Sequence, residues 1–151
     1  MSDSPVPVLR ARAVEKVYGE GTRALAGVDL DVSLGETMVL IGASGCGKTT
    51  LLRMFNRMAE PTGGEIRVAD VPTREWDPVA LRRRTGYVPQ DAGLLPHWTA
   101  GRNVALVPSL LKWSAPRVRA RVDDLLELVG LPPARFRERY PAELSGGQRQ
   151  R

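Results

Sequence analysis

The sequence has a single cysteine, no secretory signal and no long apolar run. One thiol, Cys46, cannot form an internal disulfide, so a disulfide framework is excluded as the support of this fold. The N-terminus, MSDSPVPVLR, has no apolar stretch after a basic start, as a secretory signal would require. Apolar runs such as residues 38–41 are far shorter than the roughly 18 residues of a membrane span. We therefore expect a cytoplasmic protein that reaches a membrane only through a partner.

Internal repeats and low-complexity tracts are also lacking. The 151 residues are 42% hydrophobic and 26% charged, which is enough to bury a core, so we expect one globular domain or part of one. The net charge of +5 is compatible with nucleic acid, nucleotides or an anionic membrane surface and selects none of them.

Hydrophobic periodicity predicts α/β structure in the first 90 residues. Residues 28–33, VDLDVS, alternate between apolar and polar, as in a strand of an antiparallel sheet exposed on one face. Residues 37–42, TMVLIG, form a continuous apolar run typical of a strand buried on both faces. A helix that packs on the sheet is predicted from Lys48, and further short strands at residues 65–70 and just before Gln90.

Helical signals dominate from about residue 91 to residue 143. Ser114 is a candidate N-cap, Pro116 fits a first turn, and an apolar stripe ends before Gly130. The stripe is formed by Val118, Val122, Leu125, Leu126 and Val129. The sequence thus divides into an α/β part, about 1–90, and a helical part, about 91–151.

The first motif that carries chemistry is GASGCGKTT, residues 42–50. It matches G-x-x-x-x-G-K-[ST] between a predicted buried strand and a predicted helix, the context that this pattern requires. Its glycines let the backbone N–H groups wrap around phosphate, with the positive end of a helix behind them. Lys48 is expected to reach the β- and γ-phosphates, Thr49 to ligate Mg²⁺ and Thr50 to donate to the α-phosphate. The expected nucleotide-binding residues are Gly42, Ser44, Gly45, Cys46, Gly47, Lys48, Thr49 and Thr50.

Cys46 occupies a variable position of this loop. Either its small side chain merely fits there, or its thiol, close to a helix N-terminus, is open to modification when no nucleotide is bound. The second interpretation predicts that alkylation blocks nucleotide binding and that bound ATP protects the thiol.

A second anion-facing pattern, ELSGGQRQR, ends the sequence at residues 143–151. Leu144 lies 102 positions after Gly42 (144 − 42), and YVPQD lies between them at residues 87–91. With these three motifs the sequence resembles ATP-binding-cassette (ABC) ATPases over nearly its whole length. The resemblance implies an α/β fold of the P-loop NTPase type, with an N-terminal antiparallel β part, an α/β core and a helical subdomain, truncated after the signature motif.

The resemblance also implies roles outside the phosphate loop. Tyr18 matches the aromatic that stacks on adenine, although it also fits an ordinary strand aromatic. Gln90 matches the glutamine that joins the Mg²⁺ and water environment to the helical subdomain, although it also fits a solvated loop amide. Lys48 and Gln90 are then the catalytic residues, and Thr49 and Gln90 the metal ligands.

The second motif resembles the signature that, in this family, binds the γ-phosphate of the ATP held by the opposite subunit. Its residues are Ser145, Gly146, Gly147 and Gln148. The resemblance therefore implies a head-to-tail dimer of two copies, with two ATP molecules between them.

The family continues past the signature to an Asp and a Glu that end a buried strand, and then to a histidine near the γ-phosphate. None of these can be placed here, and His97, which precedes the signature, is interpreted as a loop or surface residue. We therefore expect these residues to be the N-terminal portion of such an ATPase. Alone, this portion is expected to leave sheet edges and apolar surface uncovered, to be poorly stable and to show no appreciable turnover.

Four segments resemble the ATPases of osmoprotectant importers, which take up glycine betaine, choline, carnitine or proline: LLRMFNRMAEPTGGEI, GYVPQDAGLLPHWT, NVALVPSLLKW and ERYPAELSGGQRQR. The resemblance implies ATP and Mg²⁺ as cofactors, and permease subunits and indirectly a substrate-binding protein as partners. It implies a peripheral position on the inner face of the cell membrane. This sequence departs from the pattern of these importers at Gly101–Arg102. Such proteins usually carry an acidic residue before the asparagine that here is Asn103.

Coupling to the permease is expected around Gln90 and the loop 91–99. Its apolar residues either form an exposed knob or pack into the helical subdomain; they are Leu94, Leu95, Pro96 and Trp98. A nucleic-acid-associated ABC ATPase is the runner-up from another class, but such proteins usually carry long coiled-coil arms between the two motifs, and no heptads appear. A truncated, non-catalytic nucleotide-binding fragment also fits the sequence.

Overall fold

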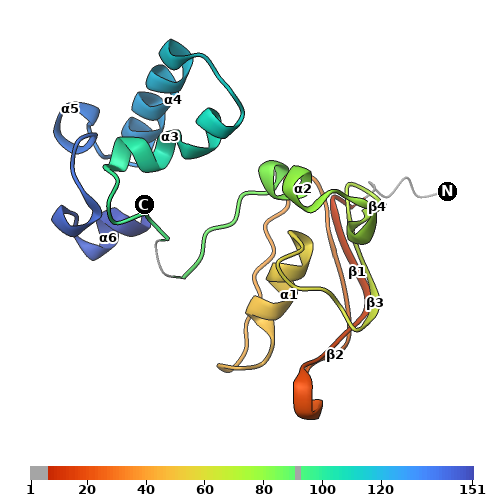
Figure 1. Cartoon of the computed structure of the whole chain (residues 1–151). Helices are drawn as coiled ribbons and strands as arrows, with labels where there is room; N and C mark the ends of the chain where they lie inside the picture. The colour runs from red at the N-terminus through yellow and green to blue at the C-terminus, as the bar shows by residue number, and fades with distance from the viewer. Residues whose placement is uncertain (1–6, 91–92) are drawn as a thin grey trace. The chain divides into compact units, whose positions relative to one another are not determined.

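The computed structural model describes residues 7–90 and 93–151 (Figure 1). Asp91 of the expected coupling loop lies outside the described residues. The chain divides into two compact units, Met1–Tyr87 and Val88–Arg151, and each has its own hydrophobic core. Within the described ranges, none of the helices combines the length and the apolar character that crossing a membrane requires.

The first unit is built on an antiparallel sheet with the strand order β2-β1-β3-β4. The strands are β1 (Leu9–Val17), β2 (Arg23–Val32), β3 (Gly63–Val68) and β4 (Val71–Pro72), and the turn η1 (Gly19–Gly21) joins the first two. The alternation in VDLDVS is confirmed as part of β2, with Val28 and Leu30 packed against the core and Asp29 and Asp31 exposed. The strand expected from residue 65 is confirmed as β3.

Helix α1 (Lys48–Phe55) packs on this sheet, as predicted. Its buried residues Leu51, Met54 and Phe55 share one core with four residues of the strands, Ala11, Val14, Leu25 and Ile66. The helix ends before Met58, although the apolar spacing extends that far. The Oδ1 atom of Asn56 accepts a hydrogen bond from the Met58 N–H at 3.1 Å, and this local bond competes with continuation of the helix.

The chain leaves the sheet through η2 (Thr73–Glu75) and helix α2 (Pro78–Arg84). Asp77 caps α2, because its Oδ1 atom accepts a hydrogen bond from the Ala80 N–H at 2.7 Å. The predicted basic helix end is confirmed, since three arginines occupy the last turn of α2.

Two of the predicted strands do not form. Residues 37–42 are irregular, with Val39 72% and Ile41 92% exposed. Residues 87–90 are irregular as well, and Val88 is 83% exposed. A strand needs lateral hydrogen bonds to a neighbour, and the ladders of the described sheet include neither stretch. The prediction of a strand buried on both faces at residues 37–42 is therefore wrong for this structure.

The second unit is helical. It contains α3 (Ala100–Leu110), α4 (Ala115–Leu128), α5 (Pro133–Phe136), η3 (Pro141–Glu143) and α6 (Gly146–Gln150). The predicted stripe helix is confirmed as α4, with Ser114 at the N-cap position and Pro116 in the first turn. Its buried residues Val122 and Leu126 pack in a core with Ala100, Leu131, Phe136 and Leu144.

Candidate functional site

The phosphate loop leads directly into α1. Gly47 is the N-cap residue, with a φ of 92° and no side-chain capping hydrogen bond. The first N–H groups of a helix have no intrahelical partner, and here the N-cap side chain accepts no hydrogen bond from them. The N-terminus of α1 is therefore open to an anion, as a phosphate-binding loop requires.

Gly47 also fixes the loop to the sheet. A Cβ atom added there would lie 2.3 Å from the carbonyl oxygen of Ala24 and 2.7 Å from the Cδ2 atom of Leu25, both on β2. Such separations are below any van der Waals contact, so only glycine lets the loop approach β2 this closely. The sheet thereby determines where the start of α1 lies.

The Lys48 side chain turns back into the loop. Its Nζ atom donates hydrogen bonds to the carbonyl oxygens of Gly42 at 2.8 Å and Ala43 at 2.7 Å, and to the Sγ atom of Cys46 at 3.3 Å. The ammonium group therefore sits inside the curve of the loop, where anionic phosphate oxygens would be stronger acceptors than these three. An ammonium group, uncapped N–H groups and the exposed Thr49 hydroxyl fit a Mg²⁺-bound triphosphate.

Tyr18 directly follows β1, and the residue is 46% exposed. The backbone around it is held by hydrogen bonds from the Tyr18 N–H to the Thr22 carbonyl at 2.9 Å and from the Gly21 N–H to the Tyr18 carbonyl at 3.2 Å. An aromatic ring that is both exposed and anchored through its backbone offers a flat apolar surface to a planar ligand.

Strand pairing connects Tyr18 with the phosphate loop. Lys16, two residues before Tyr18, pairs with Leu25 of β2, and Leu25 is the residue against which Gly47 packs. Arg53 of α1 interacts with the side chains of Tyr87 and Tyr18. Its hydrogen bond to the side chain of Tyr87 is the main cause that raises the pKa of Arg53, and Tyr18 adds a smaller electrostatic contribution.

The signature residues cap their own helix. Ser145 Oγ accepts a hydrogen bond from the Gln148 N–H at 3.2 Å, and Gln148 Oε1 accepts one from the Ser145 N–H at 3.0 Å. Leu144 is buried in the core of the second unit and anchors this turn. Gly146 and Gly147 are exposed, and no atom lies within 4 Å of a Cβ placed on either. The motif is thus a rigid turn with an open face.

The predicted site residues are divided between the two units. The first unit brings Tyr18 together with residues 42–50, whereas the exposed Gln90 and the signature residues belong to the second unit. A role for Gln90 or Ser145 at a phosphate group therefore stays a prediction.

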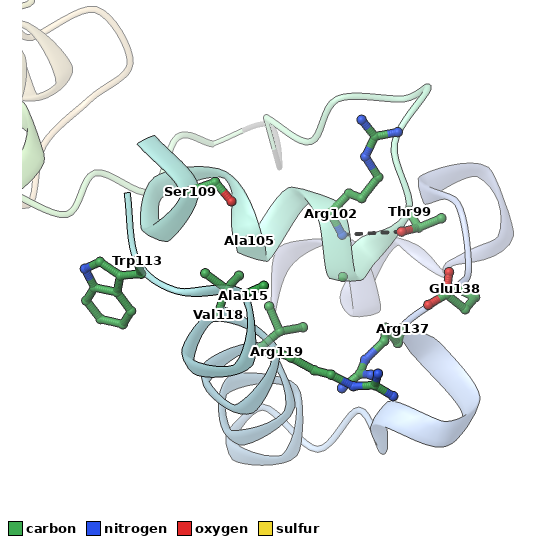
Figure 2. A pocket seen from close by; sticks show the side chains of 12 residues that line it. Thr99, Arg102, Ala105, Ser109, Trp113, Ala115, Val118, Arg119, Arg137 and Glu138 are labelled. Carbon is green, nitrogen blue, oxygen red and sulfur yellow. Dashed lines mark hydrogen bonds between the residues drawn. The ribbon is translucent and has the colours of Figure 1, made fainter. Parts of the chain in front are cut away.

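A pocket of about 470 Å³ lies within the second unit, beside α3 and α4 (Figure 2). Ala105, Val118 and Val122 give it an apolar lining, and Arg119 and Arg137 add cationic groups. Arg137 is paired with Asp123. Arg119 forms no salt bridge with the described residues. The pocket can accommodate apolar side chains and a carboxylate of a partner.

The loop before α3 is held by a residue for which the sequence predicted no role. The Asn103 side chain accepts a hydrogen bond from the Leu95 N–H and donates to the carbonyls of Leu95, Trp98 and Thr99, at 2.8 to 3.2 Å. The sequence offered only a single asparagine near the start of a helical segment as a sign of this role. Its hydrogen-bond partners are identified by the tertiary contacts alone.

The four apolar residues of this loop are partly packed. Leu94, Leu95 and Trp98 are half-buried, whereas Pro96 is exposed, so neither a fully exposed knob nor full packing is correct. Arg102, at the position of the departure from the family pattern, places its guanidinium 4.6 Å from the centre of the Trp98 ring. His97 is exposed in the loop, as expected.

Comparison with known proteins supplies the family. A family model described as ABC transporter matches residues 25–151. The glycine betaine/carnitine/choline transport ATP-binding protein OpuCA of Bacillus subtilis (strain 168) is 48% identical over 95% of this chain and 38% of its own length. The glycine betaine uptake system ATP-binding protein YehX of Escherichia coli (strain K12) is 47% identical over 91% of this chain and 44% of its own length.

Solved structures give the same result for the fold. The post-hydrolysis dimer of the ATP-binding cassette MJ0796, bound to ADP and Pi, superposes with a TM-score of 0.82 at 32% identity. The match covers 93% of this chain and 65% of that one. The chain therefore spans less than half the length of the two curated relatives and about two thirds of this cassette.

Proposed function

The chain belongs to the ABC transporter family, and we propose that it binds Mg·ATP and contributes to ATP hydrolysis that drives uptake of quaternary-amine osmoprotectants. The proposal extends to the complete ATPase, in which two copies act with membrane permease subunits and a substrate-binding protein. It places the protein in the cytoplasm, at the inner face of the cell membrane. The names of the relatives support the class of cargo.

The predicted nucleotide-binding residues each have a defined task in this function. Tyr18 binds the base, the uncapped N–H groups of α1 bind phosphate, and Lys48 leaves the loop carbonyls to neutralise the β- and γ-phosphates. Thr49, through its hydroxyl oxygen, and Gln90 would hold Mg²⁺ and its water environment. The bound ion would neutralise charge on the transferred phosphoryl group.

The observation that carries the proposal is the inward-turned Lys48 ammonium at the open start of α1. We expect Lys48→Ala to weaken Mg·ATP binding by at least roughly tenfold, since charged hydrogen bonds contribute about 1.5–3 kcal/mol. Isothermal titration calorimetry measures the change, and Lys112→Ala, which removes an exposed ammonium of the second unit, is the matched control. A Lys48→Ala variant that binds Mg·ATP as tightly as the parent would refute the proposal.

The head-to-tail dimer is tested through the open face of the signature. Gly146→Asp introduces a carboxylate opposite the γ-phosphate of the ATP held by the second subunit, and the added Cβ atom has room, because no atom outside the helix backbone lies within 4 Å of it. We expect ATP-dependent dimerisation in analytical ultracentrifugation to be lost while ATP binding to the single chain is retained. Gly146→Ala, which adds volume without charge, is the control, and an unchanged dimer in the Asp variant would exclude this interface.

Docking of the permease is assigned to the loop 93–99 and the pocket beside α3 and α4. Partial exposure of Trp98 and the apolar pocket lining support this surface. In a complex reconstituted with the permease, Trp98→Ala should reduce transport more than it reduces ATP binding. Lys48→Ala provides the comparison, because it should reduce ATP binding first, and the reverse ranking for Trp98 would contradict the contact.

The cargo is tested in the same reconstituted system. We expect uptake of labelled glycine betaine to depend on ATP and to be competed by choline or carnitine. DNA should leave the rate of hydrolysis unchanged. Stimulation by DNA, without osmoprotectant uptake, would favour the nucleic-acid-associated alternative.

A further inference from the structure

The ring of Tyr18 has a cation beside it. The Nζ atom of Lys16 lies 5.1 Å from the centre of the Tyr18 ring, within the range of a cation–π interaction. Lys16 lies near the end of β1, and Tyr18, in extended conformation, directly follows the strand. Because the two residues are two positions apart in extended backbone, their side chains leave it on the same side.

The Lys16 ammonium is itself held in place. Its Nζ atom donates a hydrogen bond to the Glu60 carbonyl oxygen at 2.6 Å, on the segment that follows α1. Two bonds of Thr62 strengthen this connection: its N–H donates to the Glu15 carbonyl at 2.9 Å, and its Oγ1 accepts from the Val17 N–H at 3.1 Å. The position of the ammonium is therefore determined by the tertiary structure.

No carboxylate competes for this ammonium among the described side chains, because none forms a salt bridge with Lys16. Glu60, the nearest acidic residue of that segment, pairs its own carboxylate with Arg57 at 2.7 Å. The charge of the Lys16 ammonium is thus not neutralised by a carboxylate, and it can act on the ring of Tyr18.

We propose that Lys16 is a positioning residue for the nucleotide base: it holds one face of the Tyr18 ring and leaves the other face for adenine, the base expected there under the function proposed above. Tyr18 is 46% exposed, which leaves room for a stacked base. A cation on one face withdraws electron density from the ring, and this favours stacking of a π-system on the other face.

The same residue connects the base with the phosphates. Lys16 pairs with Leu25, and Leu25 lies against Gly47 at the start of α1. A nucleotide whose phosphates occupy the loop therefore has its base near the end of β1. Loss of the Lys16 charge should change recognition of the base without changing recognition of the phosphates.

The experiment compares Mg·ATP with Mg·tripolyphosphate, which has no base, by isothermal titration calorimetry. Lys16→Met keeps most of the stem and removes the charge, whereas Lys16→Arg keeps the charge. We expect Lys16→Met to weaken ATP binding roughly two- to fivefold, the size of an exposed cation–π interaction. Tripolyphosphate affinity should stay at the parent value, and Lys16→Arg should restore most of the ATP affinity. Lys112→Met, which removes an exposed ammonium elsewhere, is the matched control.

Three outcomes overturn the proposal. Equal losses for ATP and tripolyphosphate would make Lys16 a structural anchor of the loop. An ATP affinity of Lys16→Met equal to that of the parent would show that Lys16 does not act on the base. An unchanged ratio in Tyr18→Ala would show that Tyr18 does not bind the base at all. Failure of the parent protein to bind either ligand would instead contradict the nucleotide-binding function proposed above.

Discussion

Among the glycines of the phosphate loop, Gly47 is the one whose replacement by alanine should have the largest local effect. Gly47 has a φ of 92°, which L-residues with a Cβ atom avoid at a cost of about 1–2 kcal/mol. The added Cβ atom would also lie 2.3 Å from the Ala24 carbonyl oxygen. That oxygen belongs to the backbone of β2, so it cannot move without disturbing the sheet. Overpacking of this kind costs a further ~1–3 kcal/mol.

Gly45→Ala separates the two costs. Gly45 has a φ of 82°, and no atom lies within 4 Å of a Cβ placed there. This variant should therefore lose only the conformational contribution, about 1–2 kcal/mol, whereas Gly47→Ala should lose about 2–5 kcal/mol in total. The difference between the two variants measures the close approach of the loop to β2.

Equilibrium urea unfolding followed by far-UV circular dichroism gives the free energy of unfolding of each variant. Its slope should be the same for both, since neither substitution changes the surface exposed on unfolding. If Gly47→Ala is no less stable than Gly45→Ala, then the phosphate loop does not contact β2 as the structure shows. If Gly47→Ala binds Mg·ATP as tightly as the parent, that result would also contradict the close approach of Gly47 to β2.

Three further predictions follow from the structure. Asn103→Ala should destabilise the loop before α3 by about 1–3 kcal/mol, because the Leu95 N–H loses its buried partner, and hydrogen exchange at that amide measures the loss; unchanged exchange would contradict the assigned contact. The hydrogen bond from Arg12 lowers the pKa of Asp31 below its usual 3.8, so its stabilising effect is present above pH 3.8 and is lost as the pH falls through the lowered pKa. In Asp31→Asn the free energy of unfolding should therefore fall less steeply as the pH is lowered below about 3.8. An acid dependence identical to that of the parent would exclude the Arg12–Asp31 pair as a cause of the loss of stability in acid. Alkylation of the exposed Cys46 by N-ethylmaleimide should block nucleotide binding and be prevented by ATP, because its Sγ atom lies 3.3 Å from Lys48 Nζ; mass spectrometry follows the modification, and full alkylation with binding intact would disprove the prediction.

Much of the secondary structure was predictable from local patterns. The alternation in residues 28–33 gave the strand β2, and the stripe from Val118 to Val129 gave the helix α4. These predictions succeed because a period of two or of 3.6 is a property of neighbouring residues. The phosphate-loop pattern likewise identified the open start of α1, since glycine and lysine at fixed spacing express a local backbone requirement.

The sequence by itself determined the helices α1 and α4, the antiparallel strands β2 and β3, the phosphate loop and the family resemblance. Tertiary structure alone decided that residues 37–42 remain unpaired, that Gly47 lies against β2 and that the Lys16 ammonium lies beside the Tyr18 ring. The physical reason is the range of the interactions. Periodicity and helix capping act over a few positions of one segment, whereas lateral strand pairing and close backbone approach depend on segments that are distant in sequence.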